Sequence, residues 1–133
     1  MTRRAHLVLL TGLLGLAACA TSAVSVPSGP PPPALVPEAV DEPPRPVGGL
    51  RAVQERAEYP VAARNRRISG QVVVSAVVDP EGHVVWAGVE TSVHPLLDES
   101  SVRAVLASRF VPAVLDGETV QVRTLVPLTF RLR

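Results

Sequence analysis

The sequence of 133 residues has little of several things that larger or more specialised proteins need. It has one cysteine, one tryptophan, one tyrosine and two phenylalanines, and all of its basic residues are arginines. Thirteen basic residues nearly balance twelve acidic ones, for a formal net charge of +1. The single cysteine excludes an internal disulfide, and the balanced charge excludes the basic field that nucleic-acid binding requires. A chain of this length has room for one small domain.

The sequence also lacks a hydrophobic run long enough to span a bilayer. Its longest apolar run, residues 7–18, follows two arginines, and as a helix it would measure roughly 18 Å against a bilayer core of about 30 Å. The run ends in Leu-Ala-Ala-Cys, and Cys19 is the only cysteine. This pattern resembles a bacterial lipoprotein signal, which implies cleavage before Cys19 and its acylation. Ordinary signal cleavage after Ala20 is the alternative.

An acylated cysteine predicts where the protein lies in the cell. Each buried CH₂ group contributes about 0.8 kcal/mol, so several acyl chains on Cys19 would anchor the protein stably in a lipid bilayer. Ala20 follows the cysteine, in place of the aspartate that resembles an inner-membrane retention signal. We therefore expect an outer-membrane lipoprotein that faces the periplasm. A periplasmic protein anchored in the inner membrane is the alternative.

Most of the 14 prolines lie between Pro27 and Pro46. Proline removes amide donors and fixes φ, so this stretch is unsuited to a helix or a central strand. Its composition also buries too little apolar surface to offset the entropy of folding. We therefore expect three segments: a signal peptide over residues 1–18, a lipidated cysteine with a disordered proline-rich tether over 19–50, and a folded domain over 51–133.

The folded domain shows helix and strand signals in alternation. Pro60 suits the first position of a helix, and the sequence 79–82 contains the proline and glycine of a turn. The expected elements are a helix over 60–67, strands over 71–78 and 83–89 joined by that turn, a helix over 95–110 and a strand over 120–132. This order predicts an α+β fold, a two-layer sandwich of a three-stranded antiparallel sheet with two short helices on one face.

The last expected strand carries the candidate binding residues. Its even positions are mostly apolar and its odd positions mostly polar, so one face covers the core. Pro127 cannot donate to a ladder, which puts the strand at the edge of the sheet, where another extended segment can pair with it. A second copy of this chain could dimerise through the same edge. The residues expected to pair with a partner strand are Gln121, Arg123, Leu125, Thr129 and Arg131.

Several short motifs, in their order and spacing, resemble the TonB C-terminal domain family over residues 51–133. The motif positions are Tyr59, Pro60, Gly70, Asp79, Gly82, Phe110, Pro112 and Phe130. The resemblance implies the same two-layer fold and a role as a periplasmic energy transducer to outer-membrane transporters. It also implies that a short receptor segment adds as a strand to the sheet edge. Members of the family usually begin with an inner-membrane helix, where this chain has a lipoprotein-type signal.

The sequence shows no pattern for catalysis, a metal or a cofactor, because it has no glycine-rich phosphate loop, nucleophile elbow or metal-spaced cluster. We therefore expect a binding module, not an enzyme, whose partner is a segment of an outer-membrane transporter or of another envelope protein. The alternative is an envelope scaffold that binds peptidoglycan or a secretion-system component through Arg64, Arg66 and Arg67. A solvated helix face is the other interpretation of these three arginines.

Overall fold

The computed structural model describes residues 29–132. The predicted signal peptide and Cys19 therefore lie outside the described residues.

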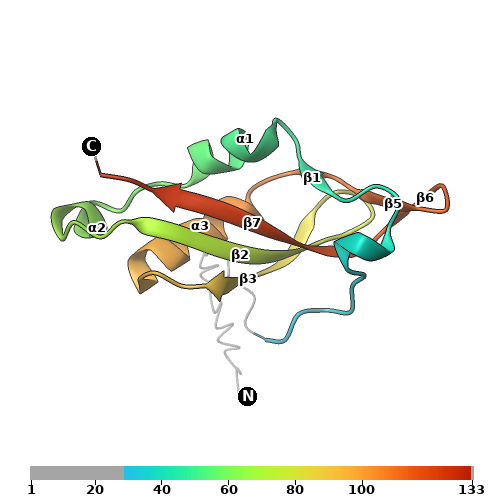
Figure 1. Ribbon diagram of the computed structural model, residues 1–133, viewed down its shortest axis with the longest axis horizontal. Helices are drawn as coiled ribbons and strands as arrows, with labels where there is room; N and C mark the ends of the chain where they lie inside the picture. The colour runs from blue at the N-terminus through green and yellow to red at the C-terminus, as the bar shows by residue number, and fades with distance from the viewer. Residues whose placement is uncertain (1–28, 133) are drawn as a thin grey trace, which may run out of the picture.

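The centre of the fold is a three-stranded antiparallel sheet in the order β3-β2-β7 (Figure 1). Strand β2 (Gly70–Val78) lies between β3 (Val84–Thr91) and β7 (Val122–Phe130). The β-branched and apolar residues at alternate positions of β2 and β7 are buried on one face of the sheet. The sequence prediction of an α+β fold with this sheet is confirmed.

Within residues 29–132, three α-helices accompany the sheet, one more than the sequence predicts. Helix α3 (Pro95–Leu106) packs on the sheet, and its Leu97 and Val105 belong to the same buried core as the strands. Helix α2 (Val61–Asn65) precedes β2, as the proline at position 60 predicts. The additional helix, α1 (Gly49–Arg56), buries Val53 in the core and runs beside β7 (Figure 1).

Most boundaries of the predicted elements move by one or two residues, and two of the elements change more than this. Helix α3 ends at Leu106, so Phe110 is not its last apolar residue and instead begins the short strand β4 (Phe110–Val111). Phe110 is buried, and its amide donates to Gly82 O at 2.9 Å, a bond that a helical Phe110 could not make. The last expected strand is interrupted at Gln121, where the hairpin formed by β5 (Ala113–Leu115) and β6 (Glu118–Val120) ends and β7 begins.

The expectation of a disordered tether is wrong for residues 29–50. This segment contains a turn of 3-10 helix, η1 (Pro37–Ala39), the short strand β1 (Arg45–Pro46) and the start of α1. We call residues 29–47 the N-terminal arm. The arm lies along the domain, bridging to β7 through Leu35 and to β5 through Glu42, while β1 pairs with β4.

The arm is held because the residues between its prolines supply the hydrogen bonds that proline lacks. Leu35 N donates to Gln121 O at 3.1 Å, Glu42 N donates to Val114 O at 3.1 Å, and Val47 N donates to Arg109 O at 2.9 Å. The prolines fix their own φ before folding, so the entropy lost when the extended arm docks is smaller than for an ordinary chain. Composition alone gave no sign of these acceptors, which lie far from the arm in the sequence.

Candidate functional site

The outer edge of β7 is the candidate binding site. Within the described residues, β7 pairs along its length only with β2, in a regular register from Gly70 opposite Phe130 to Val78 opposite Val122. This confirms that the last strand is an edge strand. Successive residues of a strand in an antiparallel ladder direct their main-chain groups alternately toward and away from the paired strand.

The odd-numbered residues of β7 direct their main-chain groups away from β2. Arg123 N donates to Leu35 O in the arm at 2.9 Å, and Thr129 N donates to Gln54 Oε1 in α1 at 2.8 Å. Both bonds lie on the side opposite β2. Pro127, at the same parity, therefore loses no ladder bond to Val73, the residue opposite it. The predicted pairing residues within β7 are those whose polar main-chain groups form its outer edge.

The edge is covered at both ends by other parts of the chain. At the start of β7, Leu35 accepts from Arg123 N, and Leu35 N donates to Gln121 O. Near its end, the Gln54 side chain accepts from Thr129 N and donates to Thr129 O at 2.9 Å. The sequence analysis missed both Leu35 and Gln54, because no local pattern marks a residue that bonds to a strand far along the chain.

The centre of the edge is open. Leu125 lies between the two covered ends and is 56% exposed. Within residues 29–132, neither its N–H nor its C=O forms a hydrogen bond outside the β2–β7 sheet. Pro127 contributes one carbonyl on the same side. A small pocket beside Leu125, lined also by Val36, Pro37 and Glu90, lies between the arm and the sheet.

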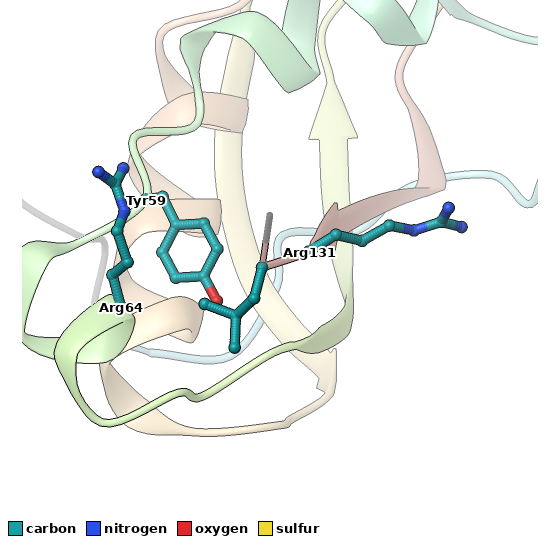
Figure 2. Close-up of a pocket in the computed structure, with 4 residues that line it drawn as sticks. Tyr59, Arg64 and Arg131 are labelled. Atoms are coloured by element: carbon teal, nitrogen blue, oxygen red, sulfur yellow. The ribbon is translucent and has the colours of Figure 1, made fainter.

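A second hollow lies at the other end of β7 (Figure 2). A pocket of about 410 Å³ is lined by Tyr59, Arg64, Arg131 and Leu132. The Arg64 guanidinium carbon lies 5.5 Å from the centre of the Tyr59 ring, a cation–π distance. Figure 2 shows the Arg131 side chain extending away from Tyr59, so the two arginines do not converge on one point. A neighbouring pocket extends the hollow to Gln54 and Thr129.

The family-motif residues identified in the sequence lie at turns and at the ends of helices and strands. Tyr59 packs edge-to-face on Phe130 at a ring-centre distance of 5.5 Å, and its hydroxyl donates to Ile68 O. Asp79 Oδ1 accepts from two amides of the β2–β3 turn, Glu81 N and His83 N.

The other motif positions are structural in the same way. Pro60 precedes the first residue of α2, and Pro112 separates β4 from β5. Gly70 has φ +150°, and a Cβ there would lie 3.0 Å from the Val93 side chain.

The three arginines of the alternative hypothesis are all exposed. Arg64 is in the last turn of α2, Arg66 caps that helix, and Arg67 follows with φ +54°. The structure does not test whether they bind peptidoglycan, which stays a prediction. In the described part of the chain, no three His, Cys, Asp or Glu side chains are grouped to hold a metal ion. Of the helices within residues 29–132, none is long and apolar enough to cross a membrane.

Comparison with known proteins relates the chain to one family and to one full-length protein. The family model of the Gram-negative bacterial TonB protein C-terminal matches residues 55–132. Protein TonB of Vibrio cholerae serotype O1 is 32% identical over 84 residues, which are 62% of this chain and 34% of that protein. The chain thus spans about a third of the length of this relative.

The solved structure of a similar domain agrees with the fold. The solution NMR structure of the Pseudomonas aeruginosa TonB CTD is 25% identical, with a TM-score of 0.50 over 68% of this chain and 87% of that one. The NMR structure of the Helicobacter pylori TonB-CTD is 24% identical, with a TM-score of 0.45 over 63% and 89% of the two chains.

Proposed function

Because the chain belongs to the TonB C-terminal family, we propose that it serves TonB-type energy-dependent transport in the cell envelope as a binding module. Its partner is an extended periplasmic segment of an outer-membrane transport component, which adds as a fourth strand to β7. The role is binding and involves no catalytic step. The observation that carries the proposal lies at the centre of this edge strand, where the outward N–H and C=O of Leu125 have no hydrogen-bond partner within residues 29–132.

Strand addition suits this edge on physical grounds. A partner strand would bond to the outward N–H and C=O of Leu125 and to the outward carbonyl of Pro127, while alternate partner side chains would reach the pocket beside Leu125. Each such hydrogen bond contributes roughly 1 kcal/mol net, so a short segment would bind reversibly. Edge addition of a second copy of this chain, giving a homodimer, would use the same groups.

The proposal is tested by removing one donor from the edge. Leu125→Pro deletes the outward N–H, and by parity it leaves the β2–β7 ladder complete. Leu125→Ala is the matched control, because it shortens the side chain and keeps the N–H. The probes are ten-residue synthetic peptides from the periplasmic amino-terminal segments of outer-membrane transporters in the same organism.

We expect Leu125→Pro to weaken peptide binding by roughly five- to tenfold, as loss of one hydrogen bond predicts, and Leu125→Ala to change it less. Binding is measured by isothermal titration calorimetry. Equal affinity of the proline and alanine variants would refute strand addition at this edge.

We also propose that the protein is a lipoprotein anchored through an acylated Cys19, in the outer membrane and facing the periplasm. The support is the sequence of residues 1–20. Mass spectrometry of the mature amino terminus tests it, because cleavage before Cys19 and a lipid-sized mass increase are expected there. Fractionation of inner and outer membranes then distinguishes the two anchoring sites. A mature chain that begins at Thr21 would contradict lipidation and support ordinary secretion.

A further inference from the structure

The Gln54 side chain bonds to the outward main-chain groups of Thr129 as a neighbouring strand would. Its Oε1 accepts from Thr129 N at 2.8 Å, and its Nε2 donates to Thr129 O at 2.9 Å. In an antiparallel ladder, the residue opposite Thr129 would exchange these same two bonds through its own main chain. One primary amide thus satisfies both outward groups of an edge residue, and a second strand cannot bond to Thr129 while Gln54 is in place.

The arm covers the opposite end of the edge in a more extensive way. Leu35 bonds to Gln121 O and Arg123 N as a parallel strand would, and Gln121 Nε2 donates to Pro33 O at 2.9 Å. Further bonds of Glu42 and Val47 hold the arm beyond β7. Releasing the arm breaks all of these contacts, whereas releasing Thr129 requires only that one half-buried side chain rotate. The Gln54 end is therefore the easier one to open.

We propose that Gln54 is an intramolecular competitor for the binding edge, and that a partner strand extends past Pro127 by displacing the Gln54 amide from Thr129. The identity of the partner rests on the proposed function. The role of Gln54 as a competitor rests on its two bonds to Thr129 and not on the family. Gln54 precedes the segment 55–132 that the family model matches. The hollow lined by Gln54, Thr129 and Tyr59 provides space beside the exchange.

Two consequences follow from this arrangement. Without a partner, Gln54 satisfies an exposed strand edge and so opposes pairing with other copies of the chain. With a partner, the two bonds to Gln54 are exchanged for two bonds to the incoming strand, so Thr129 adds little net affinity. Removing the Gln54 amide makes the same two groups of Thr129 available, and the partner then gains the full value of bonding to them.

The first experiment needs no partner. Gln54→Met keeps the length and helix propensity of the side chain but removes both bonds, and Gln54→Ala is a second variant. Glu55→Ala is the control on the same helix. We expect amide hydrogen exchange at Thr129, followed by NMR on the folded full-length protein, to rise at least about tenfold in both Gln54 variants and to stay unchanged in Glu55→Ala. Unchanged exchange at Thr129 in the Gln54 variants would overturn the proposal.

The second experiment measures the same transporter peptides by calorimetry. We expect both Gln54 variants to bind them roughly tenfold more tightly than the unmodified protein, because a competitor worth about two weak hydrogen bonds has been removed. Equal or weaker binding by the variants would overturn this inference while leaving strand addition intact. If the unmodified protein and every variant bind no peptide, the proposed function fails, and displacement of Gln54 by such a partner fails with it.

Discussion

The amide nitrogen of Phe110 lies 2.9 Å from the carbonyl oxygen of Gly82, which ties the β2–β3 turn to the segment that follows α3. Gly82 has φ +86°, and a Cβ at this position would lie 2.1 Å from the carbonyl oxygen of Phe110. The two main chains thus approach too closely for any side chain between them. This contact fixes the β4 strand, and with it the β1 part of the arm, relative to the sheet.

Gly82→Ala is expected to destabilise the protein strongly. The substitution combines left-handed backbone strain with a collision against main-chain atoms, which cannot rotate away, and we expect a loss of roughly 2–4 kcal/mol in the free energy of unfolding. Urea unfolding followed by circular dichroism measures it. Gly117→Ala is the control, because Gly117 has φ +79° and nothing within 4 Å of its Cβ position; it should cost only about 1 kcal/mol. Similar losses in the two variants would show that the close approach is unimportant.

Gly88→Ala is expected to displace the only tryptophan. A Cβ at Gly88 would lie 2.5 Å from the Trp86 ring, so the indole must move, and its 3.1 Å bond from Nε1 to Gly29 O in the arm would be lost. We expect a red shift of tryptophan emission and a loss of about 1 kcal/mol in stability. Val85→Ala, at an exposed position of the same strand, should leave the emission spectrum unchanged. An unshifted spectrum for Gly88→Ala would contradict the packing of the indole over this glycine.

Tyr59→Phe isolates the hydroxyl from the ring. It removes the bond to Ile68 O and keeps the edge-to-face contact with Phe130, so we expect a loss of about 1 kcal/mol in stability. Tyr59→Ala removes both and should cost about 3–4 kcal/mol. Thermal and urea unfolding measure the series. Arg64→Ala, which removes only an exposed cation–π contact, should change stability by less than about 1 kcal/mol. A phenylalanine variant as unstable as the alanine variant would show that the hydroxyl dominates.

Asp41→Ala tests the attachment of the arm to the β5–β6 hairpin. Asp41 Oδ2 accepts from Asp116 N at 2.8 Å, and Asp116 has φ +52°. We expect the substitution to lower stability by about 1 kcal/mol and to speed amide exchange at Asp116. Asp41→Asn keeps an acceptor oxygen and should retain most of the protection. Exchange at Asp116 that is the same in all three proteins would contradict this contact.

Local sequence patterns were enough to predict the elements around β2. The alternation of the last strand predicted which residues of β7 face the core, and Pro127 predicted the edge. The turn at residues 79–82 followed from the fixed φ of its proline and the positive φ open to its glycine, and the helix near Pro60 followed from the preference of proline for the first helical position. The end of α3 could not be predicted from the sequence. Phe110 continues the apolar stripe of the helix, but a buried residue just after the helix gives the same pattern.

The sequence by itself determined the strand order along the chain, the edge position of β7 and which side chains of β7 face the core. These depend on periodicity and on a missing N–H, which are local properties. Only the tertiary structure decided that the proline-rich arm lies on the domain and that Gln54 covers Thr129. Both depend on hydrogen bonds between residues as far apart as 88 positions in the sequence. No local pattern encodes such bonds, because they exist only once the sheet has placed donor and acceptor side by side.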